Sequence, residues 1–173
     1  MTRTSRIIAA LCLAMTAPAL LLYAQDKKGT KAPDKKAADE HERKVKESEV
    51  PAAAVAALKK IAAGAEITQY EEEVEQGETF YEGQWKTPNG KMEVLVTPQG
   101  DVVEIEEGLA ADAIPSAVVA TAKKAAGGNE LQYEKVTEVH YKAKYKQNDL
   151  RHKIIVSPTG RTIKTEVKPL VKP

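Results

Sequence analysis

An internal repeat is the feature that most constrains how this chain can fold. The stretch VPAAAVAALKKIAAG at residues 50–64 is matched by IPSAVVATAKKAAGG at residues 114–128, an offset of 64. Further on, VTPQG at residues 96–100 is matched by VSPTG at residues 156–160, an offset of 60. One four-residue deletion in the second copy, near the EQGE at residues 75–78, accounts for the change in offset. Ordered matches with a single gap predict two copies of one structural unit.

Each copy begins with a helical pattern and continues with strands. Pro51 and Pro115 suit the first turn of a helix, and Gly64 and Gly128 suit a left-handed helix end. The first copy then has strand-like runs at Ile67–Val74, Thr79–Lys86, Lys91–Thr97 and Val102–Glu106, separated by the turn sequences QG, PNG and PQG. The second copy has such runs at Leu131–Val139, His140–Lys146, Arg151–Ser157 and Thr162–Val167. The sequence therefore predicts an α+β fold of two tandem repeats, each one helix followed by a four-stranded antiparallel meander.

Alternation within the strands predicts which side chains face the helices, because successive side chains point to opposite sides of a strand. With a turn at Pro88–Asn89, the facing pairs are Tyr81 with Val96, Gly83 with Val94 and Trp85 with Met92. The second copy gives the matching pairs Tyr141 with Val156, Ala143 with Ile154 and Tyr145 with His152. We therefore expect Trp85 and Tyr145 to occupy equivalent positions in the core.

The N-terminal end has the pattern of a secretory signal peptide. Residues 1–24 combine two arginines, an apolar run and Ala24 before a cleavage point. The run Ile7–Leu22 is interrupted by Pro18 and is shorter than the roughly 20 residues that span a bilayer. We expect cleavage rather than a retained anchor, with no membrane insertion of the mature chain. Cys12, the one cysteine, lies in this run, so the mature chain is expected to have no disulfide or thiolate site.

A charged segment follows the signal peptide. Residues 25–48 contain almost no apolar side chains, so they are expected to form a solvated spacer, with a frayed helix at 34–47 as the alternative. The predicted organisation is completed by an acidic repeat at 49–107 and a basic repeat at 113–168.

The residues of both copies resemble the PepSY-like, or β-lactamase-inhibitor-like, domain family. The shared features are the Val/Ile-Pro helix start, the Lys pair near the helix end, the Tyr-x-x-x-aromatic strand at Tyr81 and Tyr141, and the Gly turn before the last strand. The resemblance covers roughly residues 49–167. It implies a secreted or periplasmic protein without enzyme activity that binds or inhibits another protein, often a peptidase or a β-lactamase. The second copy departs from the pattern where Ala143 replaces Gly83 and NDL replaces PNG.

The sequence contains no constellation that predicts catalysis, a cofactor or a metal site. His41 lies in the spacer, and His140 and His152 are expected on opposite faces of one hairpin, where they cannot share a metal. The acidic run YEEEVEQGE at 70–78 is expected to be solvated, which leaves weak divalent-cation binding as its alternative role. No nucleophile–base pattern or phosphate loop is present. We expect a protein that is not an enzyme and needs no cofactor.

The two copies carry opposite charge. Residues 50–107 hold 12 acidic and 4 basic side chains, and residues 114–168 hold 5 acidic and 11 basic ones. The outward strand positions of the second copy carry Lys142, Lys144, Lys146, Arg151 and Lys153. Its tyrosines alternate onto the other face, which argues against a nucleic-acid partner. The charge split is explained by attraction between the copies, by head-to-tail self-association, or by capture of an anionic envelope polymer.

The strand positions that face away from the helices form the predicted interaction surface. Leu95 and Ile155 are matched apolar residues on this otherwise polar face, which indicates either a partner-binding surface or packing between repeats. An apolar centre with a charged rim is typical of protein interfaces. The predicted surface consists of Phe80, Glu82, Leu95, Lys142, Lys144, Lys153 and Ile155.

The function predicted from these features is that of a secreted or periplasmic, non-catalytic binding module. Its expected partner is another envelope or secreted protein, such as a peptidase or β-lactamase that it inhibits. The alternative is a structural or adaptor protein of the envelope with no inhibitory target.

Overall fold

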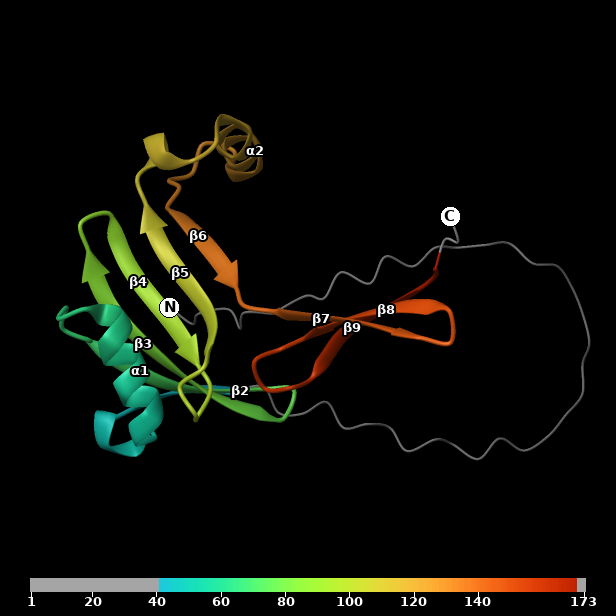
Figure 1. Ribbon diagram of the computed structural model, residues 1–173. Coiled ribbons are helices and arrows are strands. Elements are labelled where there is room, and N and C mark those ends of the chain that lie inside the picture. The colour runs from blue at the N-terminus through green and yellow to red at the C-terminus, as the bar shows by residue number, and fades with distance from the viewer. Residues whose placement is uncertain (1–40, 171–173) are drawn as a thin grey trace, which may run out of the picture.

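The computed structural model describes residues 41–170, which form two antiparallel sheets and two α-helices (Figure 1). The six-stranded sheet contains, in spatial order, β1 (His41–Val45), β2 (Gln69–Glu75), β3 (Glu78–Thr87), β4 (Gly90–Val96), β5 (Val102–Leu109) and β6 (Tyr133–Glu138). The three-stranded sheet contains β7 (Tyr141–Gln147), β8 (Leu150–Val156) and β9 (Thr162–Pro169). The helices are α1 (Ala52–Ala62) and α2 (Ser116–Ala126), and a short 3-10 turn precedes each, at Glu47–Glu49 and Ala111–Ala113. The predicted signal peptide lies outside the described residues, as does the spacer up to residue 40.

The prediction of two helix-plus-four-strand repeats is wrong. β6, which was assigned to the second repeat, pairs with β5 from Glu104–Glu138 to Leu109–Tyr133 and so joins the first sheet. The predicted spacer supplies a further strand to that sheet, because His41–Val45 forms β1 on the outer edge of β2. The alternative of a frayed helix is wrong for these five residues.

The connection between β6 and β7 explains the difference. The hairpin β2–β3 turns at Gln76 and Gly77, whose φ angles of 51° and 81° are those of a tight hairpin turn. Val139 and His140 stand between β6 and β7, and a β-branched residue such as valine is strongly disfavoured at positive φ. The Val139 N–H instead donates to the Val103 carbonyl at 2.9 Å (N to O), which continues the β5–β6 ladder. The chain therefore runs on from one sheet into the next.

The predicted strand pairings inside each copy are confirmed. β3 and β4 align Tyr81 with Val96, Gly83 with Val94 and Trp85 with Met92. β7 and β8 align Tyr141 with Val156, Ala143 with Ile154 and Tyr145 with His152. Both meanders also have a bulge at matching positions, between Leu95 and Val96 and between Ile155 and Val156. Both halves thus share the three-stranded meander, as well as the helix and the 3-10 turn before it.

The core lies between α1 and the first sheet. Leu58, Val94 and Val96 are fully buried there, and Trp85 is 5% exposed, so its predicted place in the core is confirmed. Gly83 lies directly beneath the helix, since a Cβ atom on it would stand 3.1 Å from both Leu58 methyl groups. The absence of a side chain at Gly83 lets α1 approach the sheet closely.

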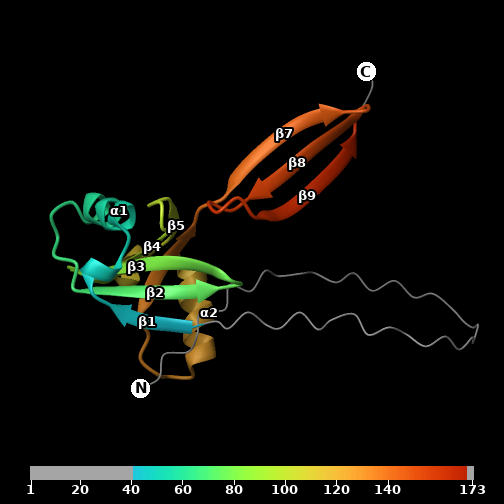
Figure 2. The ribbon, with the colours of Figure 1, turned by 90° about the horizontal axis from the view of Figure 1, so that it is seen from below.

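The second helix has no comparable contact with the second sheet. In Figure 1, α2 lies beyond the end of the first sheet at which β5 ends and β6 begins, and Figures 1 and 2 both show β7–β9 extending away from that sheet. None of the α2 residues is buried, and Tyr145 is 46% exposed. The prediction that Tyr145 matches Trp85 as a core residue is therefore wrong for the described chain.

Polar contacts fix β1 and the first 3-10 turn to the sheet. Arg43 donates from Nε and Nη2 to the two carboxylate oxygens of Glu72, at 2.8 and 3.1 Å, and this contact lowers the pKa of Glu72. The Tyr70 hydroxyl donates to Glu47 at 3.0 Å, and Glu47 also accepts from Lys59 at 2.6 Å. Burial, followed by the bond to Glu47, raises the pKa of Tyr70 to about 12.

Candidate functional site: a basic sheet face

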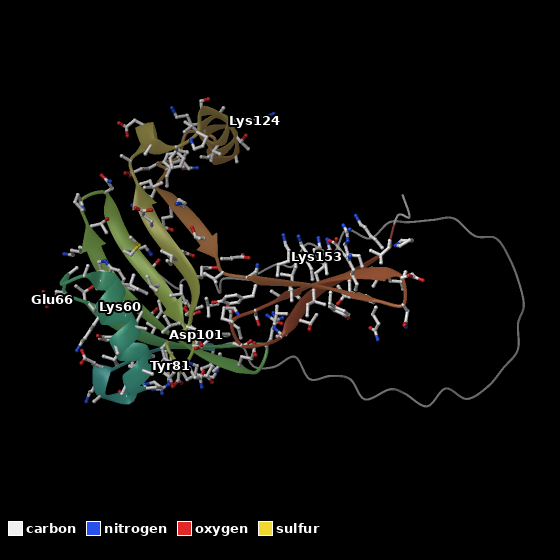
Figure 3. All side chains as sticks on the ribbon, viewed as in Figure 1. Lys60, Glu66, Tyr81, Asp101, Lys124 and Lys153 are labelled. Carbon is white, nitrogen blue, oxygen red and sulfur yellow. The ribbon has the colours of Figure 1, made fainter. Side chains whose placement is uncertain are left out.

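Strands β7, β8 and β9 place their charged side chains on one side of the sheet and their uncharged side chains mostly on the other. Lysine and arginine alternate with uncharged residues along each strand, and the cross-strand pairs Lys144–Lys153 and Arg151–Lys168 place them on the same side. We call this side the lysine face; its cations are Lys142, Lys144, Lys146, Arg151, Lys153, Lys164 and Lys168. Figure 3 shows side-chain nitrogen atoms along the edge of the sheet where Lys153 lies.

Glu166 is the one carboxylate within these three strands, and it shares the lysine face. It lies 2.6 Å from Lys153 Nζ and 2.9 Å from Lys164 Nζ. Its hydrogen bonds to Lys153 and then to Lys164 lower its pKa to about 2. Because the face has seven cations and only one carboxylate, its net charge is strongly positive.

A hollow of about 450 Å³ lies over the basic residues of this sheet. Two pairs in its lining are directly opposite each other on the ladder, Lys144 with Lys153 and Lys146 with Arg151. Like charges in opposite positions of a ladder destabilise a sheet. Glu166 offsets part of this repulsion through Lys153, and an anionic group that enters the hollow would offset more of it.

The other side of β7–β9 carries no charged strand residue. We call it the apolar face; its side chains are Tyr141, Ala143, Tyr145, His152, Ile154, Val156, Thr165 and Val167. The rings of Tyr145 and His152 stack with centroids 4.6 Å apart, which confirms that His152 lies beside Tyr145. Tyr141 and Val167 are 58% and 49% exposed. The three-stranded sheet is thus basic on one side and apolar on the other.

The first sheet has a cluster of glutamates on the side away from α1, which we call its acidic side. Glu71 pairs across the ladder with Glu82, and Glu93 with Glu106, and all four are buried. Gln84 donates to Glu82 at 2.6 Å and to Glu71 at 3.2 Å. The expectation that the acidic run at 70–78 is solvated is therefore wrong for Glu71, which is 3% exposed.

Two groups of carboxylates in the described chain have oxygens close enough to share a cation. They are Glu42, Glu71 and Glu73, and Glu93, Glu106 and Glu134. Five of these six residues have interactions with other groups of the chain, so proximity alone does not indicate a metal site. His140 and His152 belong to neither group.

The structure divides the predicted interaction surface between the two sheets. Phe80, Glu82 and Leu95 lie on the acidic side of the first sheet and are 5%, 2% and 6% exposed. Lys142, Lys144, Lys153 and Ile155 lie together on the lysine face of the second sheet. The predicted surface omitted Lys164 and Lys168, although the alternation in β9 continues the same pattern and could have revealed them.

Comparisons with known proteins do not assign a family. No family model and no curated protein matches the chain. A crystal structure from Bacteroides eggerthii, provisionally described as a periplasmic protein, matches with a TM-score of 0.40 and 15% identity, over 68% of this chain and 88% of that one. A likeness at this level carries no conclusion about function. Neither helix of the described residues is long and apolar enough to cross a membrane.

Proposed function

We propose that the chain is an exported, non-catalytic binding module that holds an acidic partner protein on its lysine face. The observation behind this proposal is the gathering of seven cations and one carboxylate on one face of three strands. Export is inferred from the signal-peptide pattern at residues 1–24.

The chemistry of the face favours a protein partner with a carboxylate-rich surface. The aliphatic stems of the lysines flank Ile155, so the face offers apolar contact below a layer of ammonium groups. Cations arranged in this way attract an acidic surface from a distance and mainly raise the rate of association. A partner that enters the hollow also relieves the repulsion between Lys144 and Lys153.

The resemblance to the PepSY-like family adds a finer proposal about the partner. The partner is an envelope or extracellular enzyme, of the peptidase or β-lactamase class, and binding inhibits it. Inhibition requires only that the lysine face cover an acidic entrance to the active site of that enzyme.

The test is a capture experiment with the mature chain, residues 25–173, on the native envelope and secreted fractions. The informative variant is Lys142→Glu with Lys144→Glu, which reverses two charges on the lysine face. Its matched control is Lys123→Glu with Lys124→Glu, which reverses the same number of exposed charges on α2. We expect the first variant to lose the captured protein, the control to retain it, and added salt to weaken capture by the wild type.

Two results would overturn the proposal. One is equal capture by both charge-reversed variants, because binding would then not use the lysine face. The other is the absence of any specifically captured protein, which would favour a structural role in the envelope. Hydrolysis assays on the captured enzyme test the finer proposal, since an unchanged rate in the complex excludes inhibition.

A further inference from the structure

Two apolar surfaces of the second half are uncovered in a single chain. One is the apolar face of β7–β9, where Tyr141 and Tyr145 are 58% and 46% exposed. The other is α2, where Val118 is 51% exposed. The matching residue of α1 is Ala54, which is fully buried against the first sheet. Matched positions of the two halves therefore differ in whether they are covered.

The first half shows how such surfaces cover each other. There α1 packs over β3 and β4, and β2, which follows α1, pairs with the outer edge of β3. In the second half β6 follows α2 but pairs with β5. Its other edge pairs with no strand of the described chain, and neither does the outer edge of β7. An unpaired edge beside an uncovered apolar face is a site for addition of another chain.

The missing turn prevents the chain from closing these surfaces on itself. Gln76 and Gly77 reverse the chain between β2 and β3, but Val139 and His140 continue it in an extended direction between β6 and β7. Shortening the connection between two elements that would otherwise pack together favours exchange between copies.

We propose that a second copy of this chain covers the apolar face. In this arrangement β6 of one copy pairs with the edge of β7 in the second copy, and α2 of the first copy lies over the apolar face of the second. The exchange is reciprocal, so both copies use the same surfaces and the assembly is a closed dimer with two-fold symmetry. It differs from head-to-tail association, which would leave a free surface at each end.

The side chains at the matching contact support this docking. In the first half the large Leu58 lies over Gly83, which has no side chain. The matching residues of the second half are Ala122 on α2 and Ala143 on β7. The smaller helix residue leaves room for the methyl group that the strand has gained. The two substitutions compensate each other only if α2 packs over a β7 strand.

The strand register gives a further sign of complementarity. The QY pair at 69–70 is matched by QY at 132–133, an offset of 63, which is one residue less than the offset of 64 between the helices. If β6 and β7 of two copies pair as β2 and β3 do, the Glu71–Glu82 pair of the first sheet is replaced by Glu134 opposite Lys142. A like-charge pair thus becomes an opposite-charge pair. The lysine face lies on the other side of the sheet from α2 and stays open, so this inference does not depend on the proposed function.

The first test is the mass of the mature chain in solution, measured by light scattering or sedimentation. We expect a dimer. The key variant inserts Gln-Gly-Glu, the sequence of residues 76–78, between Glu138 and Val139, which restores the hairpin turn and places Glu134 opposite Lys142. This variant should be a monomer, because its own β7–β9 can then turn back onto its own β6 and α2. The matched control inserts the same three residues in the exposed β7–β8 turn, between Asn148 and Asp149, and should remain a dimer.

A second test changes the helix face without changing the connection. Val118→Asp should raise the dimer dissociation constant by at least about 100-fold, because the carboxylate would be buried at the contact. Ala120→Asp is the matched control, since Ala56, its counterpart on α1, is exposed, and it should leave the constant unchanged. The Trp85 fluorescence of both variants reports whether the first core is intact.

The inference is overturned if the wild-type mature chain is a monomer at all accessible concentrations. It is equally overturned if the chain is a dimer but both the turn insertion and Val118→Asp leave that dimer intact, because association would then use another surface.

Discussion

The contact between Leu58 and Gly83 permits a quantitative test of the core. Leu58 is fully buried, so Leu58→Ala removes apolar surface and leaves a cavity, at a cost of about 2–5 kcal/mol in unfolding free energy. Gly83→Ala places a Cβ atom 3.1 Å from both Leu58 methyl groups, and overpacking of this kind costs about 1–3 kcal/mol. Each single variant is therefore expected to be clearly destabilised.

The double variant should be much less destabilised than the sum of the two. The methyl group introduced by Gly83→Ala occupies space that the leucine side chain has vacated, so the overpacking disappears and the cavity shrinks. We expect a coupling free energy of about 1–3 kcal/mol that favours the double variant. The resulting alanine pair reproduces Ala122 and Ala143 of the second half.

The assay is urea unfolding of the mature chain, followed by the fluorescence of Trp85. Trp85 is the one tryptophan of the sequence and lies in the same core cluster, so its emission reports on the contact directly. If the double variant lies within about 0.5 kcal/mol of the summed single effects, the two positions are independent and the compensation argument is refuted.

Three further expectations concern polar groups. The pKa of Tyr70 is raised from 10.0 to about 12. The stability that depends on its protonated phenol is therefore complete below pH 10 and is lost as the pH rises through 12. In measurements of unfolding against pH, Tyr70→Phe should abolish this part of the alkaline loss of stability. The pKa of Glu166 is lowered from 4.5 to about 2. The contribution of its carboxylate to stability is therefore complete above pH 4.5 and is lost as the pH falls through 2. Acid unfolding followed by circular dichroism should show this loss in the wild type and not in Glu166→Gln. Arg43→Ala removes the bidentate contact to Glu72 and should accelerate amide exchange in β1, whereas equal acceleration in β4 would show that Arg43 supports the whole sheet.

The sequence predicted the local elements of this fold well, because their signals are local. The two-residue alternation and the turn residues set the pairs Tyr81–Val96 and Tyr141–Val156, and both occur in the structure. The left-handed helix ends lie one residue earlier than expected, at Ala63 and Gly127, and the glycines that follow them, Gly64 and Gly128, also have positive φ angles. These features depend on neighbours only a few residues away.

The partner of a strand is not encoded in its own alternation. The residues of β6 show the same period whether they pair with β5 or with β7, so the assignment relied on the analogy with β2. The informative signal is the deletion in the second copy, because it removes the turn at Gln76 and Gly77 that makes β2 and β3 a hairpin. The strand β1 lacked an apolar pattern altogether, since it is held by its ladder and by Arg43 and Lys44 contacting Glu72 and Gln69.

Part of the candidate site could be predicted because it depends only on the alternation of side chains within one meander. Lys142, Lys144, Lys153 and Ile155 share a face because alternation within one meander is sufficient to group them. Phe80, Glu82 and Leu95 are on matching positions of another meander, and sequence matching alone could not show that the two meanders form separate sheets.

The strand order also bears on how quickly the chain can fold. In both sheets of the described chain, every ladder joins strands that are consecutive in the sequence. Most of these ladders close over short turns, whereas β1–β2 and β5–β6 close over the segments that contain α1 and α2, so the contact order is lowest within the meanders β2–β5 and β7–β9. No ladder crosses from β6 to β7 within one described chain, so the two sheets can form as separate kinetic units. Refolding should therefore show one phase reported by the fluorescence of Trp85 in the first sheet and another reported by amide-exchange protection of β7–β9 in the second.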